Sequence, residues 1–152
     1  MSNVFSRFHH PTGVEYWDNA ALVDAELYRI MTNEKIVPKS RRFIYTIPIL
    51  NLMGREWLFL SAAYDIYPTG EDAEEKLERK KAALRKAREV NEAILRQIQV
   101  MVIRHPEIDV NKLDNLGELI VKESALLDKA RENSKVQNGR AKPRWIKKGR
   151  DR

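Results

Sequence analysis

The feature that most constrains this chain is a long apolar run near its centre. Between Phe43 and Tyr64 the only formal charges are those of Arg55 and Glu56, and the run also contains Pro48. Its 22 residues are enough for a helix to cross a bilayer. However, an arginine at mid-bilayer costs roughly 2.5–3.5 kcal/mol. We therefore expect a helix that protein covers on more than one side, with no membrane contact.

The composition fits one helical domain. Of the 152 residues, 43% are apolar and 33% are charged, with six glycines and six prolines. Cysteine is absent, which excludes disulfides, thiol chemistry and cysteine-ligated metals. Residues 1–7 lack the apolar core of a signal peptide, so we expect a cytoplasmic protein.

Four segments show helical periodicity, and none reads as a strand. The predicted helices cover residues 16–32, 40–67, 72–104 and 109–133. Short connections between long helices favour an all-α, antiparallel up-down-up-down four-helix bundle over 16–133. We expect residues 1–15 to be irregular and 134–152 to form a basic disordered tail. Ser40 and Asp109 are candidate caps, and Pro48 predicts either a kink or a loosely wound first turn.

The second predicted helix carries more apolar surface than one bundle can bury. Its predicted core face consists of Phe43, Ile47, Leu50, Gly54, Trp57, Leu58 and Ser61. A four-helix bundle has no central helix, so we expect another copy of the chain to cover the remaining apolar residues. This predicted oligomer interface consists of Ile49, Leu52, Met53, Phe59 and Leu60, with Val100 and Ile103 from the third helix.

Residues suited to catalysis are sparse. His9 and His10 are adjacent and make a poor metal chelate, while His105 ends the third helix, where a positive charge suits the helix dipole. The acids of residues 71–75 lie where a helix N-terminus attracts carboxylates. No phosphate loop or nucleophile elbow is present. We therefore expect no enzymatic activity, no cofactor and no metal.

Basic residues are the informative feature. Residues 135–152 hold eight basic residues and one acid, whereas 1–134 hold 20 basic and 21 acidic residues. In the third helix one flank carries Lys81, Arg85, Arg88 and Arg96, and the loop before the second helix carries Lys35, Lys39, Arg41 and Arg42. The alternative for the helix residues is a solvated face paired with neighbouring glutamates.

The tail combines cations with one aromatic residue, which favours RNA: the cations can neutralise phosphates, and Trp145 can stack on an unpaired base. The alternatives are a solubilising tail and, less favoured, a membrane-surface segment, since one Trp-Ile pair offers little insertion. The candidate tail residues are Arg140, Lys142, Arg144, Trp145, Lys147, Lys148 and Arg150.

The chain also resembles a known family. Its segment 36–43, Ile-Val-Pro-Lys-Ser-Arg-Arg-Phe, followed by the apolar helix through 54–63, resembles the second-helix opening of Avd proteins, the accessory variability determinants of diversity-generating retroelements. Segments 76–79 and 94–98 are similar to that family's third helix. Proteins encoded by intervening sequences in ribosomal RNA genes share the same bundle, so the resemblance leaves both families open.

The Avd resemblance implies a homopentameric barrel that binds a reverse transcriptase and its template RNA, with cDNA or DNA as further partners. Such a barrel supports adenine-specific mutagenic cDNA synthesis. Basic residues of the bundle surface serve the nucleic acid and the enzyme in that family, which adds Arg55 to Arg41, Arg42, Arg85, Arg88 and Arg96 as candidates. The rival interpretation is an oligomeric protein–protein adaptor whose apolar second helix docks a partner.

Overall fold

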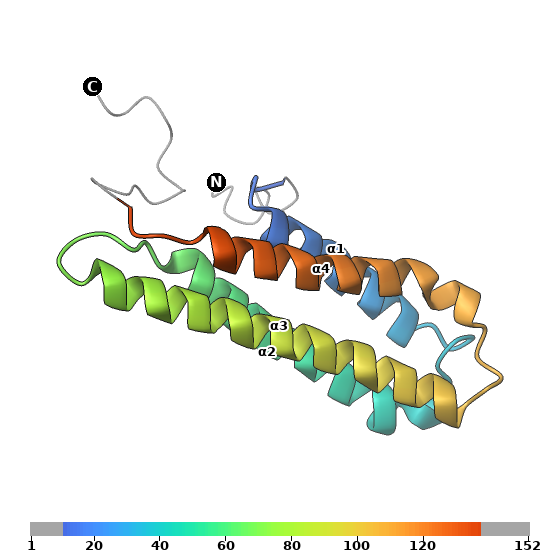
Figure 1. Ribbon diagram of the computed structural model, residues 1–152. Coiled ribbons are helices and arrows are strands. Elements are labelled where there is room, and N and C mark those ends of the chain that lie inside the picture. Colours follow the sequence, from blue (N-terminus) through green and yellow to red (C-terminus); the bar gives the residue numbers. More distant parts are fainter. Residues whose placement is uncertain (1–10, 138–152) are drawn as a thin grey trace, which may run out of the picture.

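The computed structural model describes residues 11–137. Its four long helices are α1 (Glu15–Met31), α2 (Ile47–Asp65), α3 (Ala73–Arg104) and α4 (Asp114–Asn133). Short helical turns precede α2 and α4: η2 (Lys39–Arg41), η3 (Arg42–Thr46) and η4 (Val110–Leu113). The described residues contain no strand, and the four helices lie lengthwise beside one another (Figure 1). The prediction of an all-helical four-helix bundle is confirmed.

A single apolar core lies between the helices. α2 packs on α3, α3 on α4, α4 on α1 and α1 on α2. Each helix contributes side chains without solvent exposure, such as Leu27 from α1, Leu60 from α2, Leu84 from α3 and Ile120 from α4. The periodic apolar residues of the first, third and fourth predicted helices therefore meet in one core.

The start of α2 follows one of the two expectations for Pro48. A π-helical turn, η3, precedes α2. Pro48 lies in the first turn of α2, where its missing N–H costs no helical hydrogen bond. The loosely wound start is therefore the correct alternative. Ser40 lies inside η2 and makes no side-chain cap there, so the prediction of a Ser40 cap is wrong.

Charged side chains fix two further helix ends. The Asp109 carboxylate accepts a hydrogen bond from the Asn111 backbone N–H at 3.1 Å, so the predicted cap is present, but it caps η4 rather than α4. Lys80 Nζ donates to the carbonyl oxygens of Ala63 (2.6 Å) and Ile66 (3.2 Å). It thereby adds a charged donor to the last carbonyl groups of α2, of which Ala63 also accepts from the Ile66 backbone N–H at 3.4 Å.

The predicted inner and outer faces of α2 are wrong. Ile49, Met53 and Leu60, expected at an oligomer interface, are at most 2% exposed inside the core. Phe43 and Leu58, expected in the core, are 84% and 70% exposed. Leu52 and Phe59 are half-buried against the core, as are Leu50, Trp57 and Ser61 of the expected core set, while Ile47 and Gly54 are exposed.

The reason for this exchange is Glu56. Its side chain has no solvent exposure, so the core face of α2 runs through position 56. If Glu56 is placed at the surface, as is usual for a glutamate, the buried face of α2 is predicted to face outward. Of the third-helix residues expected at the interface, Val100 is half-buried and Ile103 is 76% exposed.

Candidate functional site

The densest basic stretch of the described chain lies in the N-terminal half of α3. Residues 79–88 contain Arg79, Lys80, Lys81, Arg85, Lys86 and Arg88 and no acidic residue. Ten helical residues rise by about 15 Å, so six cations lie along a short length of one helix. A surface of this kind attracts polyanions when its charges are not already neutralised by carboxylates.

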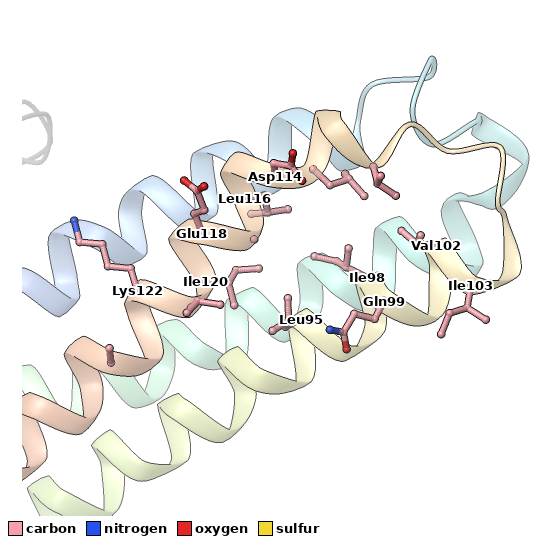
Figure 2. A pocket seen from close by; sticks show the side chains of 15 residues that line it. Leu95, Ile98, Gln99, Val102, Ile103, Asp114, Leu116, Glu118, Ile120 and Lys122 are labelled. Carbon is pink, nitrogen blue, oxygen red and sulfur yellow. The ribbon is translucent and has the colours of Figure 1, made fainter.

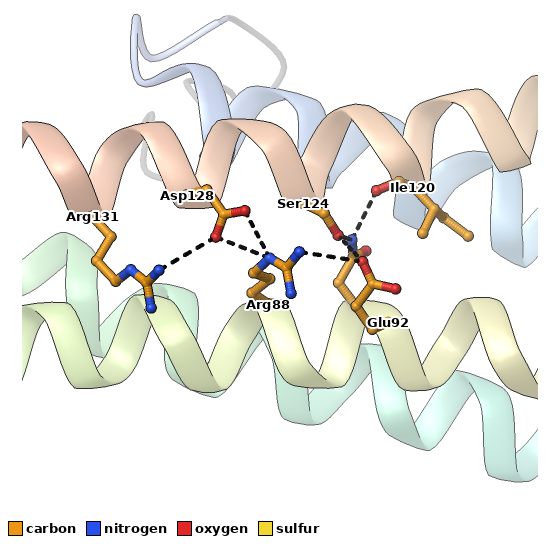
Figure 3. Close-up of polar contacts among 7 residues, drawn as sticks. Arg88, Glu92, Ile120, Ser124, Asp128 and Arg131 are labelled. Carbon is orange, nitrogen blue, oxygen red and sulfur yellow. Dashed lines mark hydrogen bonds and ion pairs between the residues drawn. The ribbon is translucent and has the colours of Figure 1, made fainter.

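Several candidate cations are paired within the protein. Arg88 Nε lies 2.9 Å from the Asp128 carboxylate of α4, and its guanidinium lies 4.0 Å from Glu92 (Figure 3). Arg41 contacts Glu107 at 2.8 Å. Glu34 pairs with two further candidates of the segment before α2, Lys39 at 3.2 Å and Arg42 at 3.4 Å.

The other candidates make no ion pair within residues 11–137. They are Arg55, Lys81, Arg85 and Arg96, of which Lys81 is half-buried and the other three are exposed. Lys86 lies over the Phe59 ring, 5.7 Å from its centroid, which holds its charge beside α2. Among the predicted RNA-binding residues, the α3 cations that remain open to a partner are therefore Lys81 and Arg85, with Arg96 further along the helix.

The C-terminal end of the described chain lies near the start of α3. The Gln137 backbone N–H donates to the Pro68 carbonyl oxygen at 3.0 Å, which ties the segment after α4 to the loop between α2 and α3. The basic residues of 138–152 thus follow a point next to the basic half of α3. Seven predicted site residues lie outside the described residues: Arg140, Lys142, Arg144, Trp145, Lys147, Lys148 and Arg150.

A buried polar layer crosses the middle of the bundle, and each helix contributes one residue to it. Asn19, Glu56, Asn91 and Glu123 are at most 4% exposed. Asn19 Nδ2 donates to Glu123 Oε1 and to the Leu119 carbonyl oxygen, both at 3.1 Å. The composition gave no sign of this layer, because charged residues are normally placed at the surface.

Asn91 joins the layer to α4. Its Nδ2 donates to the Ile120 carbonyl oxygen at 2.8 Å and to Ser124 Oγ at 2.9 Å, and Ser124 Oγ donates to Glu92 Oε1 at 2.8 Å (Figure 3). These bonds fix the register of α3 against α4, since a shift of either helix would leave the buried Asn91 amide without acceptors.

The layer has more acceptors than donors. Both oxygens of Glu56, Oε2 of Glu123 and the Oδ1 atoms of Asn19 and Asn91 are buried without a hydrogen-bond partner. Burial first, and then the nearby Glu123 and Asp24, raise the pKa of Glu56 to about 9. Burial also raises the pKa of Glu123 to about 8, against the opposing hydrogen bond from Asn19. Both carboxyl groups are therefore protonated at pH 7.

His105 occupies a polar cluster at the end of α3. Its Nε2 lies 2.9 Å from Tyr45 Oη, and its Nδ1 lies 3.6 Å from Glu107. Backbone hydrogen bonding and Arg41 lower the pKa of Glu107. The cluster anchors the turns before α2 to the end of α3, which agrees with a structural role for His105. Among the described residues, no group of three or more acidic, histidine or cysteine side chains is placed to hold a metal ion.

Two apolar surfaces remain open to solvent. The first, which we call the outer α2 face, is formed by Phe43 and Ile44 of η3 and by Ile47, Gly54 and Leu58 of α2, with Arg55 beside them. The second is a groove between α3 and α4 with a volume of about 890 Å³, shown in Figure 2. We call it the α3–α4 groove; its apolar lining includes Leu95, Ile98, Val102, Ile103, Gly117 and Val121.

Comparison with known proteins adds no assignment. No protein-family model matches the chain, and no curated protein or solved structure matches it either. Within residues 11–137, no helix combines the length and the apolar character that crossing a bilayer requires.

Proposed function

We propose that this protein is a non-enzymatic, RNA-binding accessory subunit. By its resemblance to Avd proteins, its partners would be the template RNA and the reverse transcriptase of a diversity-generating retroelement. In this role the protein holds structured RNA against the polymerase through phosphate contacts, which position a nucleic acid but read little sequence. The reaction itself belongs to the polymerase.

The observation that carries this proposal is the position of the basic groups. Lys81 and Arg85 have no carboxylate partner among residues 11–137, and they lie in an acid-free stretch of α3. The Gln137–Pro68 hydrogen bond places the root of the basic tail at the same end of the bundle. The tail and this half of α3 can therefore contact one RNA together, and each neutralised phosphate releases counterions.

The proposal also includes assembly. In this proposal the helices run up-down-up-down, as their short connections favour. Copies of the bundle form a homo-oligomer, and the Avd resemblance implies a pentamer. The exposed outer α2 face supports assembly, because Phe43 and Leu58 are 84% and 70% exposed in the single chain. Exposed apolar patches of this kind mark protein contacts.

A second candidate function is a protein–protein adaptor, which the same outer α2 face favours. In that case α2 binds a different protein, and the basic tail serves solubility. The two candidates differ in their dependence on the basic residues: an adaptor keeps its partner when the cations are removed, whereas the RNA-binding subunit loses its RNA.

The decisive experiment measures RNA affinity as a function of salt. A structured RNA is titrated with the full chain, with Lys81→Ala/Arg85→Ala and with a chain ending at residue 137. Removing one cation that binds a phosphate should reduce the slope of log K against log salt by ~0.7–0.9. Arg29→Ala is the control, because Arg29 of α1 is paired with Glu26 and is not among the predicted RNA-binding residues.

The expected result is a weaker, less salt-dependent complex for the two basic-surface variants and little change for the control. A salt-independent complex refutes phosphate binding. An affinity that neither variant lowers also refutes it and leaves the adaptor as the better interpretation.

A further inference from the structure

We propose that the α3–α4 groove of one copy binds the outer α2 face of a second copy. This inference rests on the assembly included in the proposed function and names the two surfaces that make it. The predicted interface was wrong for Ile49, Met53 and Leu60, which are core residues, so the contact must use other apolar groups.

The two surfaces differ in shape. On the outer α2 face, Ile47, Gly54 and Leu58 follow one another at intervals of seven and four residues, which aligns them along one side of the helix. Phe43 adds a large, 84% exposed side chain one turn earlier. The α3–α4 groove is hollow and apolar (Figure 2). A convex helical ridge and a concave groove between two helices are the shapes that interlock in helix packing.

Their lengths agree. From Ile47 to Leu58 the helix rises by about 16 Å, and from Asp114 to Ala125 the α4 wall of the groove also rises by about 16 Å. One copy of α2 can therefore occupy the groove along its length with little apolar surface left over.

Their charges are complementary. Arg55 is exposed beside Leu58 and makes no ion pair with any residue of 11–137. On the groove side, the lining contains two acids, Asp114 and Glu118, and one lysine, Lys122, and none of the three makes an ion pair within the described range, so the rim carries a net negative charge. Opposite charges at the rim of an apolar contact select the partner and its orientation. This complementarity favours a second copy over an unrelated apolar ligand.

Each surface has a glycine that the single chain does not need for packing. A Cβ atom added at Gly54 or at Gly117 meets nothing within 4 Å. Glycine destabilises a helix interior relative to alanine, and no close packing within the single chain explains a glycine at either position. A second helix that approaches closely at Gly54 and Gly117 supplies a reason for both.

The contact joins two different faces, so it is heterologous. Each copy keeps one free groove and one free α2 face, and further copies add head to tail. Such a contact closes into a ring when the rotation between copies permits and otherwise extends into a filament.

The test begins with Gly54→Leu. This change improves helix propensity and has room in the single chain. We expect an unfolding midpoint at least as high as that of the wild type, together with at least a tenfold increase in the dissociation constant for self-association, measured by sedimentation velocity. Val121→Lys in the groove should weaken association similarly. Leu22→Lys, at an equally exposed apolar site on α1, is the control and should associate normally.

A charge exchange tests the orientation. Arg55→Glu and Glu118→Arg should each weaken association at least fivefold, and the double variant should return to within twofold of the wild type. Because the chain has no cysteine, Leu58→Cys and Val121→Cys chains can also be mixed and treated with a short bismaleimide. Cross-linked pairs should form between the two variants and not within either one.

The outcomes separate this inference from the proposed function. A wild-type monomer at tens of micromolar overturns the interface, as does an oligomer whose only cross-links join Leu58→Cys to itself. If the copies associate as expected but the basic-surface variants do not weaken the RNA complex, RNA binding is overturned and the interface is not. If Gly54→Leu binds RNA normally and its copies associate with wild-type affinity, the interface is overturned and RNA binding is not.

Discussion

Replacing Glu56 by glutamine should stabilise the bundle, and the gain should grow with pH. Glu56 has a pKa of about 9 in the folded chain, because burial and two nearby acids oppose its charge, and an ordinary value of 4.5 when unfolded. Above pH 4.5 the carboxyl group ionises in the unfolded chain but stays protonated in the folded chain, which lowers the free energy of unfolding. The contribution of Glu56 to that free energy is therefore complete below pH 4.5 and is lost as the pH rises towards 9.

The magnitude follows from the two pKa values. Between pH 4.5 and pH 7, an interval of about 2.5 pH units, the folded chain holds a proton on Glu56 that the unfolded chain has released. At about 1.4 kcal/mol per unit this costs about 3 kcal/mol. Glutamine keeps the shape of the side chain and cannot ionise, so Glu56→Gln removes this pH-dependent cost.

Urea unfolding at pH 5, 6, 7 and 8 measures the difference. The free energy of unfolding of Glu56→Gln minus that of the wild type should increase by about 4 kcal/mol from pH 5 to pH 8. Some pH dependence remains in the variant, because the pKa of Glu123 is also raised, to about 8. Glu89→Gln, at an exposed position of α3, should follow the wild type. Parallel curves for the wild type and Glu56→Gln would refute the assignment of a protonated, buried Glu56.

Three further substitutions test the packing of the same core by urea unfolding at pH 6. Asn91→Ala removes donors to two buried acceptors and should cost about 2 kcal/mol; a cost near zero would show that water satisfies them. Trp57→Phe removes the 2.7 Å hydrogen bond from Nε1 to Asp24. It should cost about 1 kcal/mol, and a more stable variant would contradict the bond. Leu84→Ala should cost about 3 kcal/mol because Leu84 is fully buried, and a loss under about 1 kcal/mol would contradict that burial.

The helices and most of the core could be predicted from the sequence because they depend on periodicity. The stripes of the first, third and fourth helices repeat with the helical period, and each stripe lies in the core. In α2 the apolar residues extend nearly all round, so periodicity has little power to choose a face. The buried carboxyl group of Glu56 marks the inner face, and nothing in the sequence indicates that this charge is buried.

The basic site was only partly predictable for a different reason. The sequence identifies the cations, but their availability depends on partners from other elements. Arg88 and Arg85 look equivalent on one flank of α3, yet Arg88 is paired with Asp128, forty residues away, and Arg85 has no such partner within 11–137. The contact between Gln137 and Pro68, which brings the root of the tail to the basic half of α3, is equally non-local.

The two proposals use different halves of α3, and this division makes them compatible. The basic stretch 79–88 belongs to the N-terminal half, while Leu95, Ile98, Val102 and Ile103 line the groove in the C-terminal half. Between Arg85 and Leu95 the helix rises by about 15 Å, so the basic stretch and the groove use different residues of α3. Each added copy then contributes another basic surface, so that RNA affinity should rise with assembly through multivalent contact.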